Sequence, residues 1–412
     1  MRTILHSDCN NFYASVECVF SPELRGKPIA VCGDPSERHG IVLAKSDAAK
    51  KCGIKTGEAV WTARQKCPEL IVVPPCGEKY VRFSHMMRDI YAEYSDHVEP
   101  FGLDESWLDV TGRDGMEIAC SLRRRALKEL GITLSVGVSF NKVFAKLGSD
   151  MHKPDATAVI TPRNYKQKVW PMPACSLLFI GRATMHRLYA YGLNTIGDIV
   201  RADPESLHTL FGKNGDTLYA YAAGKDDAPV MPISETDDIK SVGNSTTPAF
   251  DICDYSDAGR ILYLLCDSVA ERMRKKHFRC RTVTLWLRDT QLQSFTRQMK
   301  LERPTDLSAD LSRAALALLR ESWAADRPLR SLGVQGGDLM DIRNGAQLSI
   351  LPDPLASRQA VLEKTADQLH ARFGAEALYR GVLLRQDHRL LRAAPDSSLA
   401  ATNMAAVSGR QS

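Results

Sequence analysis

The sequence has no run of eighteen consecutive apolar residues, the length that a helix needs to cross a bilayer. Its amino terminus lacks the basic, apolar and small-residue zones of a secretory signal peptide. The eleven cysteines are an odd number, and no two of them form a CxxC pair. This spacing supports neither a zinc site nor a disulfide framework. We therefore expect a cytoplasmic protein with reduced cysteines and no membrane contact.

The length and composition are those of a globular protein with several domains. A chain of 412 residues predicts about two to four domains, and 44% hydrophobic with 25% charged residues is typical of a globular fold. The formal net charge of +5 is mild. It identifies no partner until the basic residues are located along the chain.

Two apolar stretches carry acidic residues. Thr3–Tyr13 starts as a strand and runs into Asp8, and Phe101–Val110 reads as a strand, a two-residue acidic turn (Asp104 and Glu105) and a second strand. Charge at the rim of a buried sheet is costly unless a cation compensates, and carboxylates suit magnesium. Two such ions would serve phosphoryl or nucleotidyl transfer. For the acidic pair alone, a solvated hairpin tip remains the alternative.

Three ordered motifs resemble those of the Y-family translesion DNA polymerases, in particular the bacterial DNA polymerase IV branch. They are DCNNFYASVE at 8–17, FGLDESWLDVTG at 101–112 and SFNKVFAKLGSDMHKP at 139–154. The resemblance extends over about residues 1–390. It implies an α+β multidomain right-hand polymerase with a ferredoxin-like palm sheet, small fingers, a helical thumb and an α/β little finger.

The resemblance places the domains along the chain. We expect a palm at 1–20 and 77–166, fingers at 21–76, a thumb with a helix-hairpin-helix at 167–232, a linker at 233–240, a DNA-binding little finger at 241–341, and a tail with a terminal helix at 342–412.

The resemblance also implies the catalytic residues. Asp8, Asp104 and Glu105 would bind two Mg²⁺ ions, assisted by the Cys9 carbonyl. Asn11, Phe12 and Tyr13 would form the turn beneath the incoming triphosphate, with Tyr13 as the steric gate against a ribose 2′-hydroxyl. Lys50 and Lys153 would contact the triphosphate. For these residues the alternatives are core packing of the rings and ordinary helix-end or surface cations.

Two positions depart from the family pattern. Asp47 stands where many members have a tyrosine that reaches the phosphates, so Lys45 becomes a candidate substitute. Phe179 stands where the thumb hairpin usually has the first of two glycines, and only Gly181 remains. Such a hairpin offers backbone N–H groups to a DNA phosphate.

Six basic residues without an acid between 272 and 281 lead into a strand-like segment. Such a run suits a sheet that lies along a DNA backbone, although a solvated helix end is the alternative. Its members are Arg272, Arg274, Lys275, Lys276, Arg279 and Arg281.

A short glutamine-plus-aliphatic peptide follows the expected little finger. It resembles the sliding-clamp-binding peptide of bacterial polymerases, without the usual final aromatic residue, and its contact residues would be Gln347, Leu348, Ile350 and Leu351. An amphipathic helix is predicted at Arg358–Phe373.

We therefore expect a monomeric, low-fidelity DNA polymerase. Its substrates would be primer–template DNA and deoxynucleoside triphosphates, it would copy past damaged bases, and it would bind the sliding clamp. A nucleotidyl cyclase, a catalytically silent DNA- or clamp-binding relative, and a polymerase V-like subunit that needs accessory partners are the alternatives.

Overall fold

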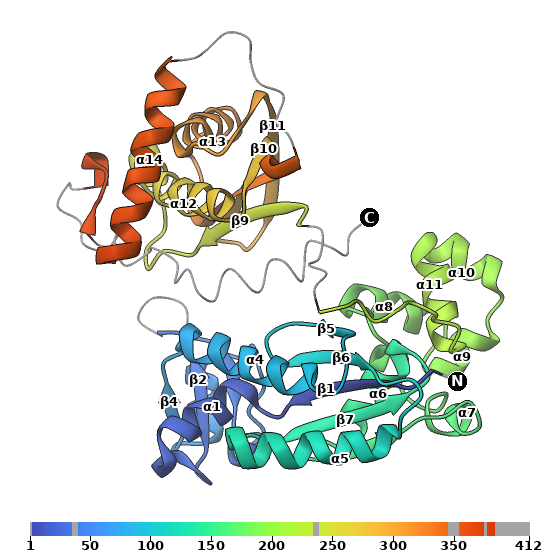
Figure 1. The fold of residues 1–412 in the computed structure, drawn as a ribbon. Helices are drawn as coiled ribbons and strands as arrows, with labels where there is room; N and C mark the ends of the chain where they lie inside the picture. Colours follow the sequence, from blue (N-terminus) through green and yellow to red (C-terminus); the bar gives the residue numbers. More distant parts are fainter. Residues whose placement is uncertain (1, 35–39, 234–238, 345–353, 375–376, 384–412) are drawn as a thin grey trace. The chain divides into compact units, whose positions relative to one another are not determined.

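The computed structural model describes residues 2–34, 40–233, 239–344, 354–374 and 377–383. The chain divides into two compact units, Met1–Cys32 with Ile41–Thr236 and Gly33–Gly40 with Asp237–Ser412 (Figure 1). Three β-sheets and many helices make the fold mixed α and β, as expected. None of the helices in the described residues combines the length and apolar character that a membrane crossing requires.

A five-stranded sheet in the order β5-β6-β1-β7-β8 organises the first unit. Its strands are β1 (Ile4–Cys9), β5 (Val98–Pro100), β6 (Glu105–Asp109), β7 (Leu134–Ser139) and β8 (Thr157–Val159). The central strand β1 pairs antiparallel with both β6 and β7, and all six of its residues are buried. Burial on both faces means that helices must cover the sheet on both sides.

Alternation along β1 shows which helix covers which face. The helices are α4 (Gly77–Ala92), α5 (Gly115–Arg125, continued by a π-helical turn Ala126–Leu130) and α6 (Lys142–Met151). Ser7 accepts a hydrogen bond from Tyr91 of α4, whereas His6 bonds to Ser149 of α6. Because successive side chains of a strand point to opposite faces, Asp8 lies on the α6 face with His6.

A smaller sheet, in the order β3-β2-β4, follows the first helix. Its strands are β2 (Ile29–Cys32), β3 (Val42–Lys45) and β4 (Ile71–Val73), and the helices around it are α1 (Phe12–Phe20), α2 (Asp47–Lys51) and α3 (Val60–Lys66). It has its own small core, which includes Ala49, Ile54 and Val60. This segment therefore packs as a separate layer within the first unit.

The rest of the first unit is helical: α7 (Tyr165–Lys168), α8 (Arg182–Ala190), α9 (Ile196–Arg201), α10 (Pro204–Phe211) and α11 (Lys213–Ala222). The helix starts follow local sequence, since Thr195 and Asp198 form a capping box and Asp203 caps α10 with Pro204 at the first position. These helices share one core with Val143 and Phe144 of α6. The helical segment is thereby attached to α6, which covers the face of the five-stranded sheet that carries Asp8.

The second unit contains a four-stranded antiparallel sheet in the order β11-β10-β12-β9. Its elements are β9 (Ser241–Thr246), α12 (Tyr255–Lys275), β10 (Phe278–Asp289), β11 (Ser294–Thr305), α13 (Ser308–Ser322) and β12 (Leu329–Asp341). Val283, Leu285 and Leu287 of β10 pack with α12 and α13 in one core. The intervening residues of β10 therefore point to the other face of the sheet.

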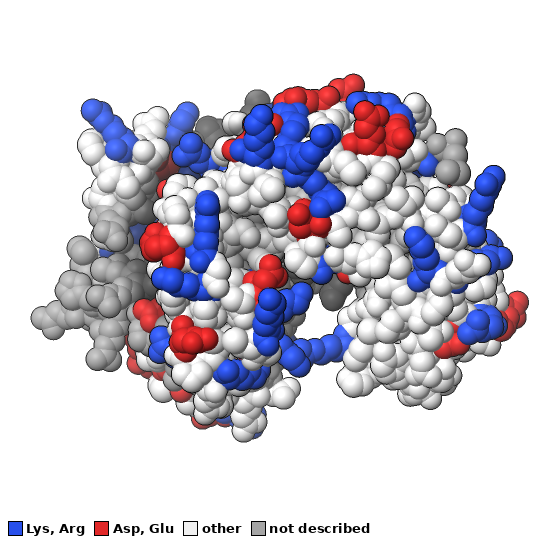
Figure 2. Space-filling view, turned by 90° about the horizontal axis from the view of Figure 1, so that it is seen from below, with Lys and Arg blue, Asp and Glu red and all other residues white. Residues whose placement is uncertain are grey.

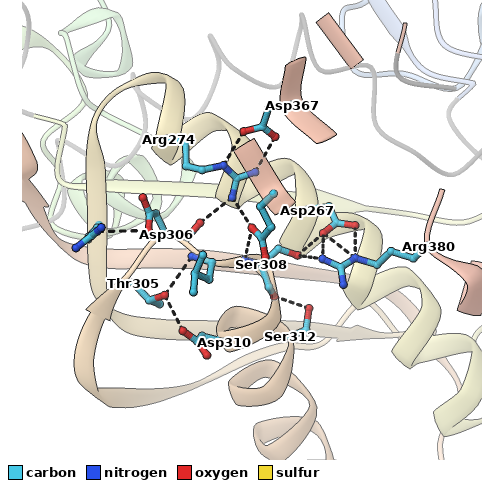
Figure 3. Close-up of polar contacts among 12 residues, drawn as sticks. Asp267, Arg274, Thr305, Asp306, Ser308, Asp310, Ser312, Asp367 and Arg380 are labelled. Atoms are coloured by element: carbon cyan, nitrogen blue, oxygen red, sulfur yellow. Dashed lines mark hydrogen bonds and ion pairs between the residues drawn. The ribbon is translucent and has the colours of Figure 1, made fainter. Parts of the chain in front are cut away.

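Helix α14 (Pro354–Phe373) docks on this second unit (Figure 3). Arg274 of α12 donates to Glu363 and, through two nitrogens, to Asp367. Arg380 makes a similar two-pronged contact with Asp267 of α12. Residues 354–374 and 377–383 thus belong to the same compact unit as 241–341.

The sequence prediction of a two-residue acidic turn was wrong. The turn comprises Phe101–Asp104, and Glu105 is already the first residue of β6. The Phe101 N–H donates to the Glu105 carbonyl oxygen at 2.8 Å, and Gly102 has a φ of 125° that favours glycine. Helix α6 begins directly after Asn141, whose side chain accepts a hydrogen bond from the Phe144 N–H.

Candidate active site

Strand pairing brings together acids that are far apart in the sequence. Asp8, near the end of β1, pairs in register with Glu105, the first residue of β6. The Cys9 N–H donates to the Asp104 carbonyl oxygen at 2.9 Å, which holds the turn against β1. The three predicted catalytic carboxylates therefore belong to one rim of the sheet.

Two lysines at α6 neutralise part of this acidic cluster. Lys153, just beyond the helix, donates to Asp8 Oδ2 at 2.6 Å. Lys146 donates to Glu105 Oε2 at 2.7 Å. Sequence reasoning named Lys153 and missed Lys146. The available signal was that Lys146 lies on the helix that follows β7, seven residues before Lys153.

Burial changes the acidity of two of the carboxyl groups. The pKa of Asp8 is raised to about 7, first by burial and then by neighbouring Glu105, with Lys153 opposing. Burial and the charges of Asp8 and Glu105 raise the pKa of Asp104 to about 7. Both shifts mean that a negative charge is costly there, and a bound cation would lower that cost.

His6 lies beneath the acids with one ring nitrogen unpartnered. Its Nδ1 contacts Ser149 Oγ at 2.8 Å, and Ser149 in turn donates its hydrogen to the Lys146 carbonyl oxygen. Nδ1 must therefore carry the hydrogen that it donates to Ser149, which assigns the tautomer. Among the residues that the structure describes, the buried Nε2 finds no hydrogen-bond partner, and it stands 3.6 Å from Glu105 Oε2.

The donors at this rim fit a hard divalent cation. Within the described ranges no three His, Cys, Asp or Glu side chains stand ready as a metal site. Lysine hydrogen bonds hold one oxygen of Asp8 and one of Glu105. Carboxylate oxygens on a desolvated rim are nevertheless the ligands that magnesium prefers. Small side-chain movements would be needed to assemble the site.

Tyr13 lies half-buried in the first turn of α1 and stacks on the buried ring of Tyr80. The two ring centroids are 4.1 Å apart, with an interplanar angle of 10°. Asn11 precedes the helix in a left-handed conformation, with a φ of 50°. Phe12 is only 3% exposed, so its ring packs in the core and its backbone alone is left for a ligand.

Asn10 is a further residue that sequence reasoning missed. Its buried side chain donates to Ser135 Oγ of β7 and accepts from the Asp155 N–H. It thereby ties the end of β1 to the segment that follows Lys153. The local sequence offered no signal, because the partners are more than a hundred residues away.

Comparison with known proteins agrees with this geometry. The impB/mucB/samB family model matches residues 7–150, and the model of that family's C-terminal domain matches 239–350. DNA polymerase IV of Acetivibrio thermocellus is 45% identical over 397 residues, covering 95% of this chain and 99% of that protein. The chain belongs to the Y-family DNA polymerases.

Other relatives support the same assignment. DNA polymerase IV 1 of Bacillus subtilis is 34% identical over 391 residues, which cover 94% of each protein. A Y-family DNA polymerase chimera of Dbh and Dpo4 has a TM-score of 0.73 at 26% identity, covering 82% of this chain and 99% of the chimera. The chain is thus a polymerase IV-like, low-fidelity translesion DNA polymerase, as predicted, and members of its family depend on divalent metal ions. This assignment decides against a nucleotidyl cyclase.

In the segment expected to form the fingers, Lys50 lies exposed near the end of α2. Lys45 donates to Thr56 Oγ1 at 2.9 Å, and partial burial together with Lys50 lowers its pKa. Asp47 is exposed in the first turn of α2. The structure therefore leaves Lys50 available to a ligand, while its role stays a prediction.

In the segment expected to form the thumb, Phe179 adopts a φ of 67°, a region that costs an L-residue about 1–2 kcal/mol. Its ring contacts Phe101 in the acidic turn and Tyr221 of α11, each with centroids 6.3 Å apart. Gly181 caps the start of α8 with no atom near the place of a Cβ. The hairpin backbone thus keeps a glycine-like conformation despite the phenylalanine.

The six basic residues expected to bind DNA have different surroundings. Arg274 is paired with the carboxylates of α14, Arg272 donates to the Gly243 carbonyl, Lys275 pairs with Glu271, and Arg279 with Asp306. Lys276 and Arg281 are exposed and form no ion pair within the described part of the chain. DNA binding by the six remains a prediction, which the geometry favours most for these two.

The sheet face turned away from α12 and α13 consists of residues that sequence reasoning did not name. We call it the open sheet face and define it by alternation and register: Thr282, Thr284, Trp286 and Arg288 of β10, and Ser294, Thr296, Gln298 and Lys300 of β11. These eight residues include two cations, and the same alternation places the exposed Glu302 after Lys300 on β11. On the face of the molecule drawn in Figure 2, basic and acidic side chains are interspersed.

The predicted clamp-binding residues Gln347, Leu348, Ile350 and Leu351 lie outside the described residues.

Proposed function

We propose that Asp8, Asp104 and Glu105, with the Cys9 carbonyl, hold two Mg²⁺ ions for nucleotide addition. The observation that carries this proposal is the register that places Asp8 opposite Glu105 with the Asp104 turn bonded to Cys9. When bound, such ions activate the primer 3′-hydroxyl and stabilise the departing pyrophosphate.

The chain's own residues then orient the nucleotide. Lys153 would leave Asp8 and donate to the triphosphate. At the start of α1, the backbone N–H groups of Asn11 to Tyr13 would donate hydrogen bonds to phosphate oxygens. Lys50 would approach the same phosphates from α2. The Tyr13 ring, held against Tyr80, would occupy the space that a ribose 2′-hydroxyl needs.

DNA would be held without reading its sequence. The open sheet face offers hydroxyl, amide and cationic groups to a sugar–phosphate backbone, and Lys276 and Arg281 add positive charge beside it. Gly181 and its neighbours would bind a further phosphate through backbone N–H groups. Weak, salt-dependent binding to any primer–template follows from this arrangement.

The remaining partners are inferred from the family and from the sequence. The peptide with Gln347, Leu348, Ile350 and Leu351 would bind the sliding clamp, and the polymerase would act as a monomer in the cytoplasm, where bacterial DNA is copied. Deleting Gln347–Leu351 should reduce capture by an immobilised clamp and leave clamp-free primer extension intact. Unchanged capture would refute the peptide assignment.

Primer extension with Asp104→Ala tests the metal site. The variant should add no nucleotide to an undamaged template in the presence of Mg²⁺, yet bind primer–template within about twofold of the parent, because metal ligands are lost and backbone contacts are kept. Asp89→Ala, at an exposed position of α4, is the matched control and should extend normally. Extension by Asp104→Ala would show that the metal site is misplaced.

A further inference from the structure

Five charged side chains of alternating sign form a continuous row at the active site. Lys153 Nζ lies 2.6 Å from Asp8 Oδ2 and 2.7 Å from Asp150 Oδ1. Lys146 Nζ lies 4.0 Å from Asp150 Oδ2 and 2.7 Å from Glu105 Oε2. Asp150 therefore stands between the two lysines, and each lysine reaches one catalytic acid.

Asp150 differs from the acids at the ends of this row. Asp8 and Glu105 lie on paired strands and are 7% and 19% exposed, whereas Asp150 lies on α6 with 47% of its side chain exposed. It occupies the helix face that carries Lys146 one turn earlier. Because it is separated from the strand rim, its contacts with the lysines can persist when Asp8 and Glu105 take other partners.

The row creates a competition for Lys153. A cation can use Asp8 Oδ2 only after Lys153 has released that oxygen, and a triphosphate can use Lys153 only under the same condition. Asp150 shares the Lys153 ammonium with Asp8 at almost equal distances. Its attraction lowers the free energy needed to move Lys153 away from Asp8.

We propose that Asp150 is a positioning residue that holds Lys153 at the end of α6 while the catalytic carboxylates exchange lysine for divalent cations and Lys153 turns to the triphosphate. This inference rests on the proposed function of the three acids. Without the Asp150 charge, Lys153 pairs with Asp8 alone. Cation binding at Asp8 then weakens. The incoming triphosphate also binds more weakly, because Asp150 no longer holds Lys153 in position.

Terbium(III) binding measures the first effect without any polymerase activity. Terbium is a hard cation with oxygen ligands, and Trp107, two positions along β6 from Glu105 on the same face, can sensitise its luminescence. Asp150→Asn should weaken binding about two- to fivefold, the range of a partly exposed ion pair. Lys153→Met should strengthen it, and Asp89→Asn should leave it unchanged.

The double variant distinguishes positioning from a general charge effect. If Asp150 acts through Lys153, adding Asp150→Asn to Lys153→Met should change terbium affinity by less than about 1.5-fold. An equal loss in both backgrounds would mean that Asp150 acts only as a distant negative charge, and would overturn the proposal. Melting temperatures close to that of the parent check that each variant folds.

Nucleotide kinetics supply the second readout. Asp150→Asn should raise the KM for the incoming deoxynucleotide about fivefold while kcat stays within about twofold, since the anchor acts on binding. Asp150→Glu should restore most of the KM. A fall in kcat with unchanged KM would overturn the proposal. Terbium binding that is undisturbed by Asp104→Ala would instead show that the proposed metal site has failed.

Discussion

The stacking of Tyr13 on Tyr80 predicts that discrimination between deoxyribonucleotides and ribonucleotides depends on Tyr80 as well as on Tyr13, the proposed steric gate. Tyr80 is fully buried, and its hydroxyl donates to Glu17 Oε1 at 2.8 Å. Lys79 donates to the other oxygen of Glu17 at 2.7 Å. The Tyr80 ring is therefore fixed from behind, and the face that it presents fixes the Tyr13 ring.

The size of the effect follows from the stacking geometry. Centroids 4.1 Å apart at an interplanar angle of 10° give an aromatic pair, worth about 0.5–1.5 kcal/mol beyond its buried area. Tyr80→Leu removes this contact and lets the Tyr13 ring move. Discrimination against ribonucleotides, as the ratio of kcat/KM values, should fall about 2- to 12-fold.

Single-nucleotide insertion with matched deoxy- and ribonucleotides measures this ratio. Tyr80→Phe is the control, because it keeps the stacked ring and loses only the hydrogen bond to Glu17. It should lower stability by about 1.5–3 kcal/mol while sugar discrimination stays within twofold. Tyr13→Ala should lose most of the discrimination. Equal stability losses in Tyr80→Leu and Tyr80→Phe with no change in sugar selection would refute the reasoning.

Three further predictions concern packing, pH and docking. A Cβ on Gly137 would lie 1.9 Å from the Ala145 carbonyl oxygen, so Gly137→Ala should destabilise the first unit by about 3 kcal/mol or more in denaturant titrations. Gly337→Ala should leave the second unit's stability unchanged, because no described atom lies within 4 Å of the place of its Cβ. In the folded protein Asp8 and Asp104 have pKa values of about 7 and therefore stay protonated between about pH 4 and pH 7. In the unfolded chain the same side chains lose their protons near pH 4. Without divalent cations its unfolding free energy should therefore fall as pH rises from about 4 to 7, and Asp104→Asn should flatten this slope. Glu363 is 4% exposed and accepts hydrogen bonds from Arg274 and from the Ser308 N–H, so Glu363→Ala should speed amide hydrogen exchange in α14. Lys364→Ala, at an exposed position of the same helix, is the control and should leave the exchange rates unchanged. Equal exchange rates in the two variants would contradict the docking of α14 on α12.

Local sequence determined much of the fold and the identity of the main site residues. The span Lys142–Met151 follows from Asn141 as a capping residue and from helical periodicity. The placement of Asp8 at a strand end and of the acids 104 and 105 next to a second strand follows from apolar runs that end in carboxylates. These signals span only a few residues, and over that distance backbone hydrogen bonding and the burial of apolar side chains restrict the chain to one secondary structure.

Only the tertiary structure decided which groups neutralise one another. Lys146 reaches Glu105 across 41 positions of sequence, and Arg274 is paired with Glu363 across 89. The first contact requires α6 to pack on the face of the sheet that carries Asp8, and the second requires α14 to return to α12. Such pairs depend on strand register and helix docking, which are set by burial summed over a whole unit. The sequence therefore shows that a residue is basic, and the fold determines whether that residue pairs with DNA, with a triphosphate or with a carboxylate of the same chain.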